Sequence, residues 1–195
     1  MKILYIFCFL FLVNKVLRAD CSDLDYADCV YWSDYCEWDD DTQECFEIGG
    51  GGDFEYGPYN FGFISEEDGL RNGPDYLDGI LYYPLDTDYL LGSIIFTPGF
   101  GGGSSTMLSW GEFFASHGFI SMVIGPNDEI NDSHEQRALG LLDAIQTIKA
   151  ENWRSDSPLN NLIDTTRFIL AGYSMGGGAS QIALMIESIH NDHIV

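Results

Sequence analysis

The sequence predicts an α/β fold in which a parallel sheet carries helices on both faces, and three observations lead to that prediction. Short apolar runs end at Pro or Gly, as buried strands do. Amphipathic stretches fill the gaps between these runs, and strands that alternate with helices favour a parallel sheet. The third observation is the segment Gly172-Tyr173-Ser174-Met175-Gly176, which lies between an apolar run and a helical pattern.

The strands of this sheet are expected at the apolar runs 79–83, 92–97, 119–124 and 167–171. The first two runs are followed by Pro, which cannot continue a central strand because it lacks a backbone N–H. No internal repeat is visible in the sequence. The runs therefore predict one sheet in one domain.

Two helices are expected between these strands. Residues 105–117 carry large apolar side chains at helical spacing, and Gly118 is placed to end that helix. The second helix opens at Asp132, whose side chain is expected to cap it while Glu135 reaches back to the cap. The apolar face of this second helix consists of Ala138, Leu141, Leu142, Ile145 and Ile148.

Residues 1–19 are typical of a secretory signal peptide. Lys2 precedes an apolar run over 3–13, and residues 16–19 provide a plausible cleavage context. The run is too short to span a membrane, although a signal anchor or a buried strand is the competing interpretation. The sequence therefore predicts a secreted, extracellular protein that begins near Asp20 and has no membrane segment in its mature form.

The region after this leader is rich in cysteine and acid. Four cysteines lie within 25 residues, and their even number in a secreted segment predicts two disulfides in any of three pairings: Cys21, Cys29, Cys36 and Cys45. A metal site is the alternative, against which stands the lack of a C-x-x-C motif or a nearby histidine. The aromatic residues either pack around the disulfides or form a surface on which sugar rings or a polymer stack.

These features predict four segments along the chain. They are a signal peptide over 1–19, an acidic Cys-rich module over 20–48, a Gly-rich linker over 49–58 and an α/β domain over 59–195. The whole chain holds 8 Lys and Arg against 31 Asp and Glu, a formal net charge of −23. So acidic a chain is repelled by phosphate, which excludes nucleic acid and anionic membranes as partners. The sequence indicates no defined protein partner.

The motif around Ser174 is the signature of a nucleophilic serine. Its flanking glycines let the backbone turn sharply from strand to helix, so that the hydroxyl is held exposed. Hydrolases with this motif take one oxyanion-hole N–H from the loop after a buried strand, here 97–103, and the other from the residue after the nucleophile, here Met175. A phosphate-binding loop is the rival interpretation of 97–103, but no G-K-[ST] is present.

Several motifs together resemble the polyester-hydrolase (PET hydrolase) and cutinase-like branch of the α/β-hydrolases, related to dienelactone-hydrolase-like esterases. The motifs cover about residues 75–190 and are the segments 78–84, 97–101, 115–119, 163–167 and 172–179. The resemblance implies an ester substrate, including polymeric polyester or cutin, and no metal or organic cofactor. It implies that Ser174 is the nucleophile and that Phe100 and Met175 supply the oxyanion-hole amides. The Phe100 ring, where the family has Tyr, forms one wall of the acyl-binding cleft.

The same resemblance places the family's catalytic Asp and His on later strands, and only 21 residues follow Ser174. His117, His190 and His193 are expected at the opposite edge of the sheet, and His134 on the active-site side but exposed. We therefore expect an inactive fragment with its carboxyl-terminal strands missing and an apolar edge strand unpaired. The alternative is a non-catalytic secreted binding protein, or pseudoenzyme, that attaches to a surface through its Cys-rich module.

Overall fold

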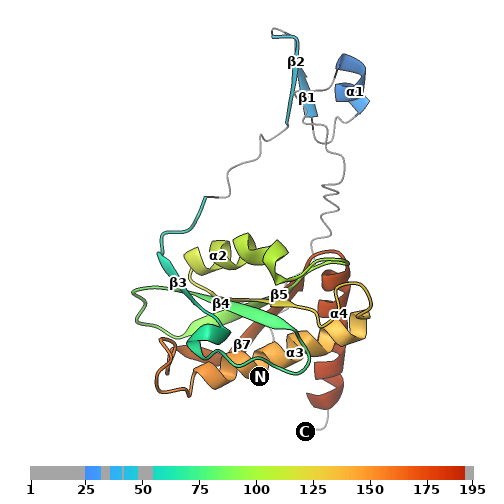
Figure 1. Cartoon of the computed structure of the whole chain (residues 1–195). Coiled ribbons are helices and arrows are strands. Elements are labelled where there is room, and N and C mark those ends of the chain that lie inside the picture. Colours follow the sequence, from blue (N-terminus) through green and yellow to red (C-terminus); the bar gives the residue numbers. More distant parts are fainter. Residues whose placement is uncertain (1–24, 32–35, 41, 48–54, 192–195) are drawn as a thin grey trace. The chain divides into compact units, whose positions relative to one another are not determined.

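The computed structural model describes residues 25–31, 36–40, 42–47 and 55–191 (Figure 1). The chain divides into two compact units, with the boundary between Glu55 and Tyr56. The predicted signal peptide and the four glycines of the predicted linker lie outside the described residues. The domain boundaries inferred from the sequence therefore stay predictions.

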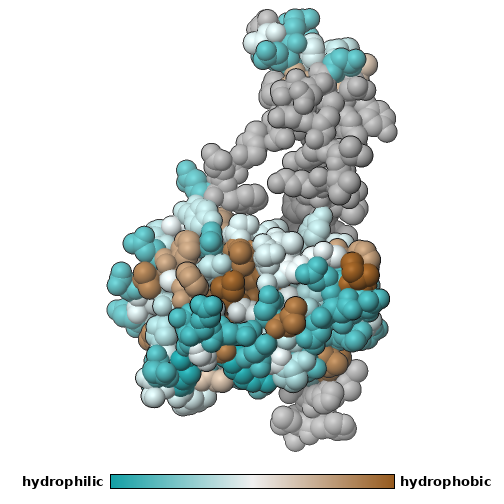
Figure 2. All heavy atoms as spheres, viewed as in Figure 1, coloured by the Kyte–Doolittle hydropathy of each residue, from teal (hydrophilic) through white to brown (hydrophobic). Residues whose placement is uncertain are grey.

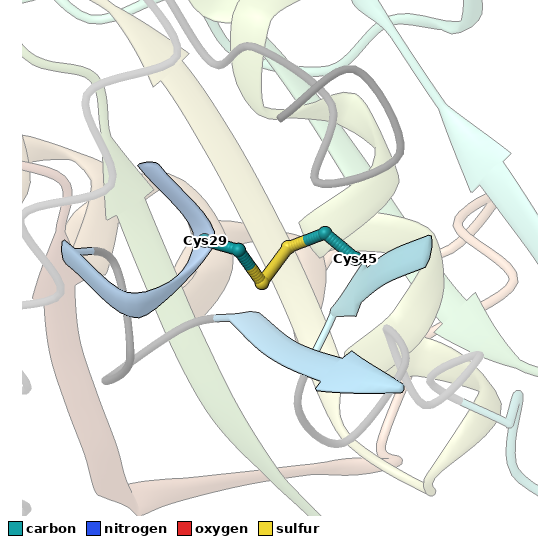
Figure 3. The surroundings of a disulfide bond; sticks show 2 residues. All are labelled: Cys29 and Cys45. Carbon is teal, nitrogen blue, oxygen red and sulfur yellow. A yellow bond between two sulfur atoms is a disulfide. The ribbon is translucent and has the colours of Figure 1, made fainter. Parts of the chain in front are cut away.

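The smaller unit consists of one helix and one hairpin. Helix α1 (Tyr26–Tyr31) is followed by the antiparallel strands β1 (Cys36–Asp39) and β2 (Glu44–Glu47). A disulfide between Cys29 and Cys45 joins α1 to β2, with the two Cα atoms 5.9 Å apart (Figure 3). Trp38 packs against this buried pair, and the Tyr26 ring meets the Trp38 ring edge-on at 5.4 Å between centroids.

One of the two predicted disulfides is thus present. Cys21 and the side chain of Cys36 lie outside the described residues, so their pairing stays a prediction. Within the described part of this unit, Trp38 packs on the disulfide, in keeping with the first of the two roles considered for the aromatic residues, whereas the Tyr26 ring is exposed. Among the described residues, no group of three His, Cys, Asp or Glu side chains is arranged to hold a metal ion.

The larger unit contains a five-stranded sheet with the order β3-β4-β6-β5-β7. Its strands are β3 (Phe61–Ile64), β4 (Asp78–Pro84), β5 (Leu91–Thr97), β6 (Ile120–Gly125) and β7 (Ile163–Gly172). Strands β6, β5 and β7 are parallel, whereas β4 is antiparallel to both β3 and β6. The sheet is therefore mixed, and the prediction of a parallel sheet is wrong for the half that contains β3 and β4.

The connections explain the mixed sheet. A parallel pair needs a crossover of about a dozen residues or more, usually a helix. Helix α2 (Leu108–Ser116) joins β5 to β6, and α3 (His134–Glu151) joins β6 to β7. Only residues 85–90 join β4 to β5, and only the 3-10 turn η2 (Glu66–Asp68) lies between β3 and β4. Strands β3 and β4 are not joined by a crossover helix and run antiparallel to each other, and β4 also runs antiparallel to β6.

Helices cover both faces of this sheet, as predicted (Figure 1). Helix α2 packs on one face, in an apolar cluster that includes Tyr82, Phe96 and Val123. Helices α3 and α4 (Met175–Asn191) pack on the other face, in a larger cluster that includes Ile95, Met122 and Leu141. No helix in the described part of the chain is long and apolar enough to cross a membrane.

The helix boundaries differ from the predictions at their amino ends. The 3-10 turn η3 (Ser104–Met107) precedes α2, and Gly118 takes a left-handed φ of 91° just after it, as expected of a residue that ends a helix. Helix α3 is capped by Ser133, whose hydroxyl accepts from the Gln136 N–H at 3.3 Å. The predicted cap at Asp132 is wrong, because that carboxylate accepts the Asp128 N–H at 3.1 Å instead.

Candidate active site

A two-residue turn places Ser174 at the carboxyl edge of the sheet. Strand β7 ends at Gly172 and helix α4 begins at Met175, so the motif has the strand-turn-helix context that its chemistry requires. Ser174 is exposed and has a φ of 50°, in the left-handed region that non-glycine residues rarely adopt. Such strain is typical of functional sites and persists only where the surroundings enforce it.

The flanking glycines bring three backbone segments into contact. A Cβ at Gly172 would lie 2.3 Å from the Gly176 carbonyl carbon, and a Cβ at Gly176 would lie 2.2 Å from the Thr97 oxygen. These positions have no room for any side chain. The first turn of α4 therefore packs directly on the ends of β7 and β5, and this contact holds Ser174 in its strained conformation.

The loop after β5 lies against the nucleophile. A Cβ at Gly99 would lie 3.2 Å from the Ser174 Cβ, which places this loop beside the serine. The Phe100 side chain is 66% exposed, and Gly101 has a φ of 72°. Within the described residues, the backbone N–H groups of Phe100 and Met175 donate no hydrogen bond. Two unpaired amides on the segments that flank Ser174 are what an oxyanion hole requires.

A buried arginine donates hydrogen bonds to the backbone of this loop. Arg137, in the first turn of α3, is 2% exposed and donates from Nη1 to the carbonyls of Pro98 (3.1 Å) and Gly99 (3.3 Å). Its Nη2 donates to the Glu129 carbonyl at 2.8 Å. Burial lowers the pKa of Arg137, and the nearby Asp132 and Glu129 partly offset that effect. An arginine still keeps its proton at any physiological pH.

Reasoning from the sequence missed Arg137, although a signal was present. Residues 137, 141, 144 and 148 follow the helical period, and the last three are fully buried. A charged residue at the head of an apolar helical stripe occupies a core position. Arginine is almost never fully buried unless its donors have partners, so the stripe indicated a buried guanidinium with specific acceptors.

The histidines lie as the sequence predicted where the structure describes them. His134 is the first residue of α3 and is exposed, and its ring lies beside Gly178, one turn along α4 from Ser174. His117 ends α2 at the opposite edge, where its ring packs on Phe113 at 4.3 Å. The side chain of His190 and all of His193 lie outside the described residues. Within those residues, no side chain bonds to the Ser174 hydroxyl.

Three exposed apolar side chains lie on or beside the loops that flank Ser174. Phe100, Ile130 and Tyr173 are 66%, 56% and 37% exposed. Ile130 belongs to the loop after β6, and its Cδ1 lies within 3.8 Å of the Cβ position of Gly101. On the face that Figure 2 draws, apolar residues of the larger unit form separate patches among hydrophilic ones. The surroundings of Ser174 are thus suited to an apolar substrate group.

Comparison with known proteins agrees with this arrangement. Cutinase est1 of Thermobifida alba is 34% identical over 125 residues, which are 64% of this chain and 40% of that protein. Cutinase cut1 of Thermobifida fusca is 32% identical over 125 residues, 64% of this chain and 37% of that protein. Lipase 1 of Moraxella sp. (strain TA144) is 33% identical over 104 residues, 52% of this chain and 31% of that protein.

The chain spans less than half the length of each of these relatives. A family model described as PET hydrolase-like matches residues 60–190, which include the whole sheet, both loops beside Ser174 and nearly all of α4. Because this match extends over more than half of the sequence and includes the strand-turn-helix motif, the chain belongs to the PET hydrolase-like family of α/β-hydrolases.

Proposed function

We propose that this protein is a secreted serine esterase that hydrolyses carboxylic esters, including polyester or cutin-like substrates. The observation that carries the proposal is the position of Ser174, strained and exposed, beside the unpaired amides of Phe100 and Met175. The relatives named cutinase and lipase support an ester as the substrate. The Cys29–Cys45 disulfide supports an oxidising compartment, as secretion provides.

In the proposed mechanism the Ser174 hydroxyl attacks the ester carbonyl and passes its proton to a general base. The negative charge that develops on the carbonyl oxygen is stabilised by the Phe100 and Met175 N–H groups. Loss of one such donor typically costs about 2.7–4 kcal/mol of transition-state stabilisation. The base then protonates the departing alcohol, and water hydrolyses the acyl-enzyme by the reverse sequence of proton transfers.

The general base is the part of the mechanism that the described residues do not provide. His134 lies beside the flank of α4, and no described side chain bonds to the Ser174 hydroxyl. We therefore expect the 195-residue polypeptide by itself to show no Ser174-dependent turnover of a p-nitrophenyl ester. Robust turnover that Ser174→Ala abolishes would assign the base to this polypeptide, with His134 as the first candidate.

The substrate preference is argued from the exposed Phe100 ring. A ring that is 66% exposed beside the nucleophile provides a flat apolar wall on which an aromatic or fatty acyl group packs. An aromatic polyester such as poly(ethylene terephthalate) and a fatty polyester such as cutin both fit this chemistry. The second candidate function is non-catalytic binding of a surface through the smaller unit, for which the exposed Tyr26 ring is the supporting observation.

Activity-based labelling separates these two candidates. A fluorophosphonate is applied to the protein as its host produces it, and the labelled peptide is identified by mass spectrometry. We expect the label on the peptide that contains Ser174 and none on Ser174→Ala, which should unfold at the same temperature as the wild type. A folded protein in which Ser174 remains unlabelled would overturn the esterase proposal in favour of the binding protein.

A further inference from the structure

We infer that Arg137 is a positioning residue of the oxyanion hole: its guanidinium orients the two peptide units on either side of Phe100, so that the Phe100 N–H faces the reacting carbonyl. The inference rests on the proposed function of Ser174. It adds a residue that touches neither the substrate nor the nucleophile and acts through the backbone of the oxyanion loop.

The contacts of Arg137 are unusual for a buried charge. Its hydrogen bonds within the described residues go to backbone carbonyls alone, those of Pro98, Gly99 and Glu129. A guanidinium has five donors in a rigid planar fork and can meet three carbonyls at once. A lysine ammonium is a compact charge at the end of a flexible chain and cannot reproduce that fork. The acceptor set therefore requires arginine.

The first peptide unit joins Gly99 to Phe100. The described part of the chain contains no cis peptide bond, and in a planar trans peptide the C=O and N–H point in opposite directions. The Gly99 carbonyl is turned toward Arg137, which donates to it at 3.3 Å, and the same oxygen accepts the Gly102 N–H at 3.2 Å. The Phe100 N–H consequently points away from Arg137, and this is the amide that donates no hydrogen bond in the described structure.

The second peptide unit joins Phe100 to Gly101. The Gly101 N–H donates to the Glu129 carbonyl at 2.9 Å, and the same carbonyl accepts from Arg137 Nη2 at 2.8 Å. One oxygen thus links the guanidinium to the far side of Phe100. The Gly99 carbonyl and the Gly101 N–H, one from each peptide unit around Phe100, are both held on the side that faces Arg137. The Phe100 N–H is therefore directed away from Arg137.

A merely space-filling role does not explain these contacts. The Arg137 Nε–H is buried and has no partner among the described residues, which is a cost that a methionine of similar volume would avoid. The guanidinium offsets this cost through the three backbone carbonyls to which it donates. Those carbonyls belong to the loop that lies beside Ser174, where a Cβ at Gly99 would be 3.2 Å from the Ser174 Cβ.

The test compares Arg137→Lys with Arg71→Lys in the protein as its host produces it. Arg71 is a matched control because it also bonds to α3, through Asp143 and Thr147, but does not touch the oxyanion loop. Arg137→Lys should lower kcat for p-nitrophenyl butyrate by about 100-fold, because a misplaced donor loses most of its effect, while KM changes little. Arg71→Lys should leave kcat unchanged.

Hydrogen exchange provides a readout that does not depend on turnover. The Gly101 amide is bonded in the wild type and should lose protection in Arg137→Lys, while the amides of β5 and β6 keep theirs. Arg137→Met, which keeps the side-chain bulk, should behave like Arg137→Lys. Retained protection of Gly101 overturns the inference even if Ser174 proves inert.

The two proposals fail in different ways. If Ser174 takes the fluorophosphonate but the two lysine variants have equal kcat values, the positioning role is wrong and the esterase function stands. If Arg137→Lys loses protection throughout β5 and β6, its role is general stability and the inference is again wrong. If wild-type Ser174 does not react, the proposed function itself is wrong.

Discussion

The two edges of the parallel half of the sheet are built in opposite ways. At the carboxyl edge, Ser174 is strained, a buried arginine has an unpaired Nε–H, and two backbone amides have no partner among the described residues. At the amino edge, the turn before β7 pairs its buried polar groups, and its left-handed residue is Asn161 (φ 60°), a residue type that tolerates this conformation. Asn152, for example, is 6% exposed and accepts the Ile163 N–H through Oδ1 at 3.0 Å and the Asn161 N–H through its carbonyl at 3.0 Å.

The difference shows where polarity serves stability and where it serves chemistry. An unpaired buried polar group costs free energy, and the left-handed conformation of a serine adds a cost of similar size. Such costs also occur away from the site, at the buried hydroxyls of Ser93 and Ser121, which have no partner in the described part of the chain. At the carboxyl edge, however, they lie beside an exposed serine hydroxyl. Substitutions at the carboxyl edge should therefore change reactivity beyond their effect on stability, and substitutions at the amino edge should change stability alone.

The largest effect is expected for Gly176→Ala. The new Cβ would lie 2.2 Å from the Thr97 oxygen and 2.7 Å from the Pro98 oxygen, so α4 must move away from β5. We expect the free energy of unfolding to fall by an amount at the upper end of the about 1–3 kcal/mol that overpacking costs. We also expect no detectable labelling of Ser174 by a fluorophosphonate. Chemical denaturation and mass spectrometry measure the two effects.

Gly92→Ala is the matched control at the start of β5. Its Cβ would meet the Arg167 Cβ at 3.8 Å, an ordinary van der Waals distance, so the strand has room for it. This variant should be as stable and as reactive as the wild type. Equal behaviour of the two alanine variants would show that the close packing around Gly176 is not needed for the site.

A smaller effect, on stability alone, is expected for Asn152→Ala. Removing its side chain leaves the buried Ile163 N–H without an acceptor, which costs about 1–3 kcal/mol. Asn160→Ala is the control, because the carbonyl to which its Nδ2 donates also accepts the Asn161 N–H. Ser174 should react equally in both variants below their unfolding temperatures. A loss of reactivity in folded Asn152→Ala would contradict the separation of the two edges.

The sequence was sufficient for the parts of the fold that depend on strong local patterns. The runs that became β5, β6 and the end of β7 are apolar and bounded by breakers, and the glycines around Ser174 admit only a tight turn. Strand β3 was missed because Phe61–Ile64 is short and contains Gly62, which weakens the strand pattern. The direction of β4 is set by its neighbours and the short connection to β5, neither of which local periodicity reports.

Long-range contacts account for the remaining differences. Asp132 and Ser133 are both good helix caps, and the choice between them depends on the Asp128 N–H, which occupies the Asp132 carboxylate. The role of Arg137 depends on carbonyls up to 39 positions away in the sequence. The motif around Ser174 predicts a nucleophile, but the orientation of the loop beside it is a property of the folded chain.

Phe100→Tyr should have only a mild effect on reactivity at the carboxyl edge. The side chain is 66% exposed, so a hydroxyl reaches solvent, and the backbone amide keeps its neighbours. We expect the free energy of unfolding to change by no more than the about 0.5 kcal/mol typical of surface substitutions, and kcat/KM for p-nitrophenyl butyrate to stay close to the wild-type value. Phe100→Ala should instead raise KM, because it removes the apolar wall. A large loss in Phe100→Tyr would mean that the ring is packed inward and that this loop is only a structural turn.

The smallest effect concerns the loop after β6, which supplies the Glu129 carbonyl. The Asp128 carboxylate accepts from the Asn131 side chain and from the backbone N–H groups of Asn131 and Ile130, and these bonds lower the pKa of Asp128. A carboxyl whose pKa is lowered on folding contributes stability above its unfolded pKa, about 3.9, and loses that contribution as the pH falls through the folded value. The loop should therefore loosen only in acid.

Hydrogen exchange of the Ile130 and Asn131 amides tests this expectation. Their protection should be constant from neutral pH down to about 5 and should fall below about 4, as Asp128 takes up a proton. Asp128→Asn keeps an acceptor oxygen and should remove most of the pH dependence, whereas Asp128→Ala should lose protection at every pH. Because Gly101 donates to the Glu129 carbonyl of this loop, its amide should follow the same pH profile in the wild type. A Gly101 amide whose protection does not change in acid would mean that Arg137 is sufficient by itself to hold the Glu129 carbonyl, without the hydrogen bonds of Asp128.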